Sequence, residues 1–168
     1  MERYDQHNND PEDPRYREFL GRLFHPLCEL LEPKSKGLDF GSGPGPTLNI
    51  MFEEQGHEMN IYDPFYADDP TVFEETYDFI TSTEVAEHLH NPKEEFDKLW
   101  SCLRPGGYLG IMTKLATDDK DHFADWHYRL DNTHVTFYTR DTFRWLAEYW
   151  DASLNFYKNS VMIFQKRS

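Results

Sequence analysis

A glycine-rich segment has the residue types and spacing best suited to chemistry in this chain. Residues 37–45 read GLDFGSGPG, in which a short apolar run contains an acid and three glycines then alternate with other residues. Glycine lets a backbone turn sharply out of a strand and lie close against a ligand. A helical pattern begins near Pro46, and the first N–H groups of such a helix attract negative charge. The segment predicts a nucleotide-type ligand site at a strand–helix turn.

Two ligand classes and one structural alternative compete for this loop. The dinucleotide fingerprint Gly-x-Gly-x-x-Gly needs its third glycine or alanine where this chain has Pro46, and the third glycine here comes one residue early, at Gly45. This shift disfavours NAD as the ligand. The pattern present is Asp-x-Gly-x-Gly-x-Gly, from Asp39 through Gly41 and Gly43 to Gly45. An ordinary tight turn that binds nothing stays open as an alternative.

A second group of candidate residues comprises Glu84, Glu87 and His88. Their spacing of i, i+3 and i+4 places three side chains on one face of a helix. Two carboxylates and an imidazole can hold a divalent cation, although magnesium prefers oxygen ligands. The alternative is that His88 packs or caps while the two acids face solvent.

Histidine and aromatic residues are dense in residues 125–138 (DWHYRLDNTHVTFY). The segment follows a strand pattern, which places it over the sheet edge where open α/β folds bind substrates. His134 is the candidate general base because imidazole titrates near neutrality, and a loop hydrogen bond is its alternative role. Trp126 and Tyr128 are candidate walls of an acceptor pocket, or else residues that pack the loop.

Hydrophobic periodicity predicts alternating strands and helices. Residues 1–13 are polar and predict a flexible arm, and a single domain occupies residues 14–168. The expected helices are 14–31 (kinked or split at Pro26), 46–55, 84–90, 92–103 and one that begins at 139 or 141 and ends near 150. The expected strands are 37–41, 57–62, 77–82, 108–112 after a turn at 104–107, and a hairpin of 152–157 and 161–165. This order is typical of a Rossmann-like, doubly wound, mainly parallel α/β sheet with a C-terminal antiparallel hairpin.

Composition excludes several classes of function. The 168-residue chain carries a net charge of −14, which disfavours nucleic acid and anionic lipid as partners because both need clustered Lys and Arg. No apolar run approaches the roughly 20 residues of a membrane span. Cys28 and Cys102 are the only cysteines, so neither a disulfide framework nor a cysteine zinc site is expected. We expect a cytoplasmic protein.

Four elements in chain order make the chain resemble a small class I S-adenosylmethionine (SAM) methyltransferase. They are the loop LDFGSGPG, Asp63 at the end of the second strand, YDFITSTEVAEHLHNP and LRPGGYLGIMT, and the terminal hairpin matches the last two strands of the family. The resemblance covers nearly the whole chain after residue 14. The motif Glu-Val-x-Glu-His, from Glu84 to His88, is similar to that of ubiquinone-pathway O-methyltransferases, and this implies magnesium as a second cofactor.

The resemblance implies a role for each cofactor-site residue. The glycine loop would back the methionine part of SAM, with Asp39 ordering the loop or the ammonium group, and Asp63 would accept the ribose hydroxyls about 20 residues beyond the loop. A turn-forming Asp63-Pro64 pair is the alternative. Phe65 or Tyr66 would lie against the adenine or in the core. The expected cofactor-binding residues are Asp39, Gly41, Ser42, Gly43, Gly45, Asp63, Pro64, Phe65, Thr81, Ser82, Thr83 and Glu84.

One departure from the family concerns the second crossover. Only 13 residues, 64–76, separate the second and third predicted strands. A crossover helix and a further strand need roughly twice that length. We therefore expect about six strands, because the family's third strand and its helix are shortened.

The expected reaction is transfer of the SAM methyl group to an oxygen, nitrogen or carbon nucleophile of a small molecule. Two alternatives from other classes stay open. One is a SAM-binding module without catalysis, and the other, which is disfavoured, is an NAD-dependent oxidoreductase. A piece of a longer enzyme is a third alternative.

Overall fold

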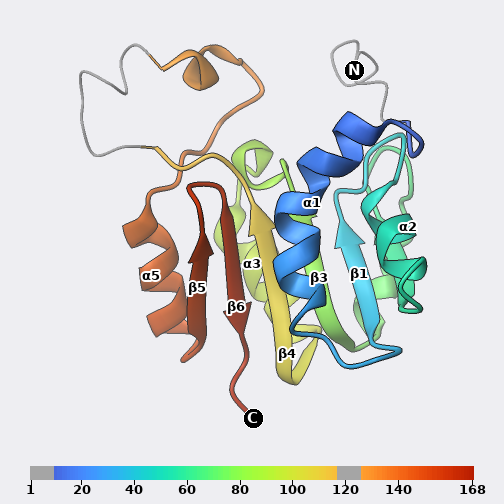
Figure 1. Ribbon diagram of the computed structural model, residues 1–168. Coiled ribbons are helices and arrows are strands. Elements are labelled where there is room, and N and C mark those ends of the chain that lie inside the picture. The colour runs from blue at the N-terminus through green and yellow to red at the C-terminus, as the bar shows by residue number, and fades with distance from the viewer. Residues whose placement is uncertain (1–9, 117–125) are drawn as a thin grey trace.

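The computed structural model describes residues 10–116 and 126–168, and the strands of these residues form one six-stranded sheet (Figure 1). The strand order is β2-β1-β3-β4-β6-β5. Strands β1 to β4 pair in parallel, whereas β6 runs antiparallel to both β4 and β5. The predicted sheet type and terminal hairpin are confirmed. The bounds are β1 Lys36–Phe40, β2 Glu58–Tyr62, β3 Tyr77–Thr83, β4 Leu103–Met112, β5 Ser153–Tyr157 and β6 Val161–Gln165.

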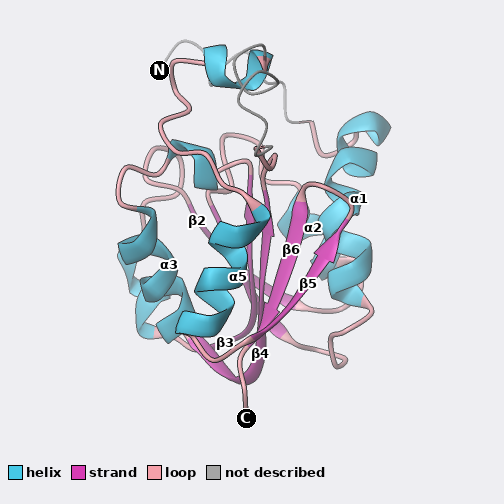
Figure 2. Ribbon diagram, turned by 90° about the vertical axis from the view of Figure 1, so that its left-hand side faces the viewer, coloured by secondary structure: helices cyan, strands magenta, loops and turns pink. Residues whose placement is uncertain are grey.

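Helices cover both faces of the sheet, as a doubly wound fold requires (Figure 2). Helices α1 (Pro14–Cys28) and α2 (Leu48–Glu53) lie on one face, and α3 (Pro92–Ser101) and α5 (Arg140–Tyr149) lie on the other. Leu23 and Phe52 belong to the apolar cluster beneath α1 and α2, and Phe96 and Phe143 belong to the cluster beneath α3 and α5. The two clusters hold the strands rigidly, so that the strand ends can position a site.

The connection between β2 and β3 is short, as the sequence predicted. In place of a crossover helix and a strand it contains one 3₁₀ helix, η2 (Pro70–Glu74). Val72 is buried, and Phe73 packs edge-on against the rings of Phe40 and Tyr62. This short connection leaves β2 as an edge strand of the sheet.

Two helices differ from the sequence-based expectation. Helix α1 is not split at Pro26, because it continues through this residue to Cys28. Pro26 removes one i→i−4 hydrogen bond, the one to the carbonyl of Arg22, and the helix ends two residues later. Helix α2 has six residues instead of the ten expected, since it begins only after Thr47, whose hydroxyl donates to the carbonyl of Gly45. The first N–H groups of this helix therefore lie two residues further along the chain than the sequence suggested.

The expected turn at 104–107 is also wrong, because these residues lie inside β4. The pairing of β3 with β4 shifts register there, and Gly106 has a φ of 81°. A bulge of this kind lets a turn-like sequence continue a strand. The expected helix at 84–90 is only the 3₁₀ helix η3 (Ala86–His88).

The arm and the substrate-side loop lie only partly within the described residues. Residues 1–9 of the predicted arm and residues 117–125 of the predicted loop lie outside them. Residues 126–139, called the covering loop below, include the 3₁₀ helix η4 (His127–Leu130) and pass over the carboxyl ends of the parallel strands (Figure 1). Among the described residues, no helix combines the length and apolar character needed to cross a bilayer.

Candidate active site

Asp39 lies at the carboxyl end of β1 and is almost completely buried, with 4% of its surface exposed. Thr81 Oγ1 donates a 2.7 Å hydrogen bond to its carboxylate from the neighbouring strand β3. Burial, and then the charge of Asp63, raise the pKa of Asp39 to about 6, while the Thr81 bond acts in the opposite direction. A buried carboxylate that titrates near neutrality is typical of a binding or catalytic site.

Asp63 lies at the end of β2 and turns its carboxylate inward, with 7% of the residue exposed. Oδ2 accepts the Gly43 N–H at 2.9 Å, and Oδ1 accepts the N–H groups of Phe65 and Tyr66 at 2.9 and 3.2 Å. Three of about four acceptor positions are therefore used within the chain. Asp63 thus holds the glycine loop against β2, and it also closes a turn through paired main-chain bonds with Ala67.

The glycine loop requires glycine for two separate reasons. Gly41 and Gly43 have φ values of 81° and 68°, in the left-handed region that favours glycine. A Cβ atom on Gly41 would lie 2.2 Å from Cγ2 of Val85. The glycine loop therefore packs directly against Val85. The missing side chain of Gly41 makes room for Val85 rather than for a ligand.

Three buried hydroxyl groups near the loop have no hydrogen-bond partner among the described residues. They belong to Ser42 in the glycine loop and to Ser82 and Thr83 at the end of β3. Buried polar groups are nearly always paired. Together with Asp39 and Asp63, these hydroxyls make the carboxyl ends of β1 to β3 a polar site suited to a ligand with several hydrogen-bonding groups.

Pro64, Phe65 and Tyr66 lie on the surface beside this site. Phe65 is 70% exposed, and Tyr66 is also exposed, so neither is a core residue. Both side chains are near Asp63, because their N–H groups bind its carboxylate. This excludes the core alternative and leaves their predicted contact with a base as a prediction.

Glu84 directly follows β3 and has a left-handed φ of 53°. Its N–H donates to the carbonyl of Met112, which fixes it between the ends of β3 and β4. Burial, and then the charge of Glu87, raise the pKa of Glu84 to about 7. The positive charges of Lys114 and Arg22 lower the same pKa but do not outweigh this effect. Such a carboxyl group can hold or accept a proton near neutrality.

Tyr16 of α1 is a neighbour of the site that sequence reasoning missed. Burial, and then the charges of Asp39 and Glu84, raise the pKa of Tyr16 to about 12. The tyrosine therefore stays protonated and can only offer a neutral hydroxyl to the site. Its position in an apolar helix pattern gave no signal that distinguished it from a core residue.

Glu87 is the most deeply buried acid near the strand ends, with 1% exposed. Thr113 Oγ1 donates to its carboxylate at 2.8 Å, and the hydroxyl of Tyr128 donates to the other oxygen. Its main-chain carbonyl accepts the N–H groups of Val135 and Thr136 at 2.8 and 3.1 Å. Glu87 therefore joins η3 to the covering loop from both its side chain and its backbone.

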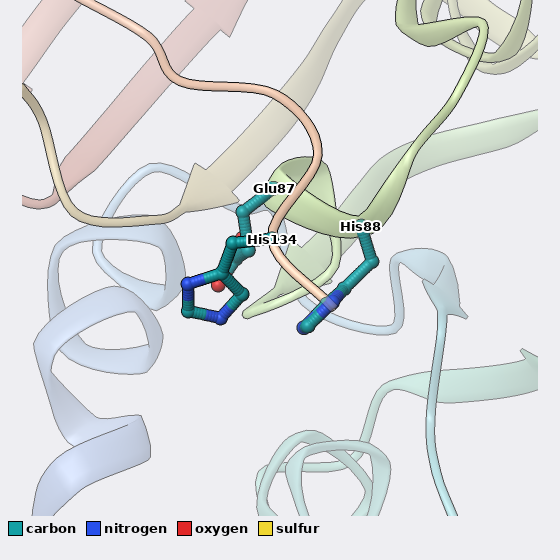
Figure 3. A group of neighbouring side chains, drawn as sticks. All are labelled: Glu87, His88 and His134. Carbon is teal, nitrogen blue, oxygen red and sulfur yellow. The ribbon is translucent and has the colours of Figure 1, made fainter. Parts of the chain in front are cut away.

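His134 lies beside Glu87 and His88 (Figure 3). His134 Nδ1 bonds the carbonyl of Tyr128 at 2.7 Å, and His88 Nδ1 bonds the carbonyl of Thr133 at 2.9 Å. Tyr128 is buried with its ring 4.0 Å from that of His134, and the half-buried Trp126 packs against it. Both aromatic side chains therefore form part of the covering loop's own packing.

The residues predicted as metal ligands differ in one member from the group that the structure brings together. The helical face expected for Glu84, Glu87 and His88 does not form, because Glu84 has a left-handed backbone and η3 is a single 3₁₀ turn. Within residues 10–116 and 126–168, the acids and histidines that lie close enough to share an ion are Glu87, His88 and His134 instead. Sequence spacing could not show that a residue 46 positions later completes the group.

Comparison with solved structures shows the fold alone, because the three structures described here are each under 25% identical to this chain. One match is 1,6-didemethyltoxoflavin-N1-methyltransferase from Burkholderia thailandensis, whose structure contains 1,6-didemethyltoxoflavin and S-adenosylhomocysteine. The match covers 89% of this chain and 78% of that one, with a TM-score of 0.67 and 16% identity. An O-methyltransferase family 2 protein from Planctomyces limnophilus in complex with apigenin matches over 92% of this chain and 60% of that one (TM-score 0.60, 16% identity). The YcgJ protein of Bacillus subtilis matches over 90% and 99% (TM-score 0.59, 13% identity).

No curated protein sequence shows significant similarity to this chain. The sequence model of the methyltransferase domain family, in contrast, matches residues 12–152, which is most of the chain. This match includes the glycine loop, both strand-end acids and the covering loop, and it removes the oxidoreductase alternative. The chain therefore belongs to the methyltransferase domain family and is a class I SAM-dependent methyltransferase.

Proposed function

We propose that this enzyme transfers the methyl group of SAM to an oxygen, nitrogen or carbon atom of a small molecule at the carboxyl ends of β1 to β4. The observation that carries the proposal is Asp63, which is buried at the end of β2 with its carboxylate bound to the Gly43 N–H. This contact joins the glycine loop to the predicted ribose-binding acid. Bound SAM supplies an electrophilic methyl group on its sulfonium.

The cofactor side would use the residues at the ends of the first three strands. Asp63 Oδ2 retains acceptor capacity for a ribose hydroxyl, and the exposed rings of Phe65 and Tyr66 would contact adenine. Asp39 would face the ammonium group. The unpaired hydroxyls of Ser42, Ser82 and Thr83 would receive partners when the cofactor binds, and Thr81 and Glu84 would border the methyl group.

The acceptor side would lie between Glu84 and the covering loop. Because a carbonyl oxygen only accepts, His134 Nδ1 must donate to Tyr128, and in the neutral ring the lone pair is then on Nε2. That nitrogen would take the proton of a hydroxyl acceptor as it attacks. The site would supply the rest of the rate enhancement by aligning the methyl donor with the acceptor and by excluding water.

A neutral or cationic small molecule is the acceptor class that the charges favour. Glu84 and Glu87 border the acceptor side, and the chain as a whole has a net charge of −14. The structures matched above include one methyltransferase whose name specifies a small-molecule acceptor and one O-methyltransferase family 2 protein in complex with the small molecule apigenin. The similarity of Glu84–His88 to ubiquinone-pathway O-methyltransferases rests on that motif alone. The proposal that this motif binds a magnesium ion rests on the same similarity.

Calorimetric titration with SAM, S-adenosylhomocysteine and NAD tests the proposal. We expect the first two to bind and NAD not to bind. Asp63→Asn should weaken SAM about 10- to 100-fold, since a hydrogen bond to a charged acceptor is lost, whereas exposed Asp68→Asn should bind like the wild type. Binding of NAD alone, or no loss in Asp63→Asn, would overturn the proposed site.

Transfer of labelled methyl groups to a panel of phenols, amines and carbon acids separates the enzyme from a non-catalytic SAM-binding module. The proposal expects at least one acceptor class to be labelled in an enzyme-dependent manner. SAM binding without transfer to any class would favour the non-catalytic module.

A further inference from the structure

We propose that Glu87, His88 and His134 bind one divalent transition-metal ion of zinc-like preference, which joins η3 to the covering loop. The three side chains come from two segments that are far apart in sequence and meet at one place (Figure 3). The ligand set differs from the one that the sequence suggested, because His134 replaces Glu84.

The geometry of the group is close to that of a three-ligand site. One ligand atom from each residue lies within 4.8 Å of the other two. Tetrahedral coordination with bonds of about 2.1 Å separates ligand atoms by roughly 3.4 Å. Side-chain movements of about an ångström would therefore complete the site, and no change of fold is needed.

The hydrogen bonds of the two histidines prepare them for a metal. Nδ1 of His88 is 2.9 Å from the carbonyl of Thr133, and Nδ1 of His134 is 2.7 Å from the carbonyl of Tyr128. Because each Nδ1 donates its proton, the lone pair of each neutral ring is on Nε2. Histidine ligands in metal sites commonly donate their other N–H in this way, which fixes the tautomer and the ring orientation.

The third ligand, Glu87, is a buried carboxylate without a basic partner. The described residues include no Lys or Arg that forms an ion pair with it. The hydroxyls of Thr113 and Tyr128 orient its two oxygens and leave each with acceptor capacity. A cation beside it would compensate the cost of burying its charge.

The chemistry of the donor set indicates the class of metal. Two imidazole nitrogens and one carboxylate suit zinc, cobalt or ferrous iron, whereas magnesium prefers an all-oxygen shell. Three protein ligands also leave a coordination position open, as in catalytic rather than structural zinc sites. The ion would occupy the same Nε2 lone pair that is proposed above as the general base, so the two roles of His134 exclude one another in any one molecule.

The test uses the full chain, stripped with a chelator and then equilibrated with Zn²⁺, Co²⁺ or Mg²⁺ in the absence of SAM. We expect about one Zn²⁺ or Co²⁺ per chain by elemental mass spectrometry, visible absorption of tetrahedral or five-coordinate Co²⁺, and little Mg²⁺. His134→Ala and His88→Ala should each weaken Zn²⁺ more than about 100-fold. His90→Ala, an exposed neighbour outside the group, is the matched control and should bind like the wild type.

Circular dichroism of each variant shows whether it folds. Glu87→Gln, which removes the charge of the third ligand, should also weaken Zn²⁺ binding. Equal Zn²⁺ affinity in His134→Ala and His90→Ala would overturn the site. Magnesium binding that is lost in Glu84→Gln but kept in His134→Ala would overturn it in favour of the set expected from sequence. Because metal is measured without SAM or acceptor, these outcomes are independent of whether the proposed methyl transfer occurs.

Discussion

Asp39 and Thr81 are register partners in the parallel β1–β3 pair, and Thr81 Oγ1 donates a 2.7 Å hydrogen bond to the Asp39 carboxylate. The bond crosses between the two central strand ends that border the glycine loop. Because sheet register determines this contact, the acid is positioned before any ligand binds. The cost of the arrangement is a buried carboxylate whose pKa is raised to about 6.

Replacing this carboxylate should stabilise the ligand-free protein above pH 6. The ordinary pKa of Asp39 is 3.8 and its folded-state pKa is about 6. Below about pH 4 the group is protonated in both states and carries no penalty. Between pH 4 and 6 the unfolded chain releases the proton first, so folding stability falls as pH rises, by about 3 kcal/mol in all.

Asp39→Asn removes that titration and keeps an oxygen that can accept from Thr81. We expect the difference in unfolding free energy between the variant and the wild type to increase from pH 4 to 6 and to stay constant above. Urea unfolding at several pH values measures it. A difference that is independent of pH would contradict the raised pKa. The same variant should bind SAM more weakly if Asp39 faces the ammonium group.

Gly41→Ala should destabilise the protein through two separate effects. Its φ of 81° is unfavourable for alanine, and the new Cβ would lie 2.2 Å from Val85 Cγ2. We expect a loss of about 2–4 kcal/mol by chemical denaturation. Combining it with Val85→Ala should recover only the part due to the clash. Gly56→Ala also has a positive φ but meets no atom within 4 Å, and it should cost less.

The meeting of the glycine loop with the strand-end acids could be predicted because its signals are local. The spacing of Asp39, Gly41 and Gly43 and the position of Asp63 are readable in one stretch of sequence, and the structure brings these residues together through the Asp63–Gly43 bond. The short loop after β2 likewise predicted the missing strand. The glycine spacing reflects a backbone turn and the missing strand reflects a chain length, so both of these constraints act within a short stretch of sequence.

The acceptor side could not be predicted in this way. The Glu87 carboxylate meets Thr113 after β4 and Tyr128 in the covering loop, contacts that depend on how three distant segments pack. The helical spacing of Glu84, Glu87 and His88 predicted a shared helix face that does not form, because the left-handed backbone of Glu84 interrupts the helical periodicity. The turn expected at 104–107 failed for a similar reason, since a strand with a bulge tolerates Gly106.

Thr113→Val should loosen the covering loop. The substitution keeps the side-chain shape but removes a donor to the buried Glu87 carboxylate, at a cost of about 1–3 kcal/mol. We expect a lower thermal midpoint and faster hydrogen exchange at Val135 and Thr136, whose N–H groups bind the Glu87 carbonyl. Exposed Thr76→Val is the control. Unchanged exchange at these two amides would show that Glu87 does not hold the loop.

His134→Ala should lower kcat for a hydroxyl acceptor by about 10²- to 10⁴-fold, the contribution of a positioned general base. The SAM dissociation constant should stay constant, because His134 contacts Tyr128 and His88 rather than the glycine loop. Added imidazole should restore part of the rate if a base is missing. A neutral amine acceptor, which can attack before it loses a proton, should be affected far less. If SAM affinity falls in parallel with kcat and imidazole restores nothing, the ring only supports the covering loop, and the base is then to be sought at Glu84, whose pKa of about 7 suits the same task.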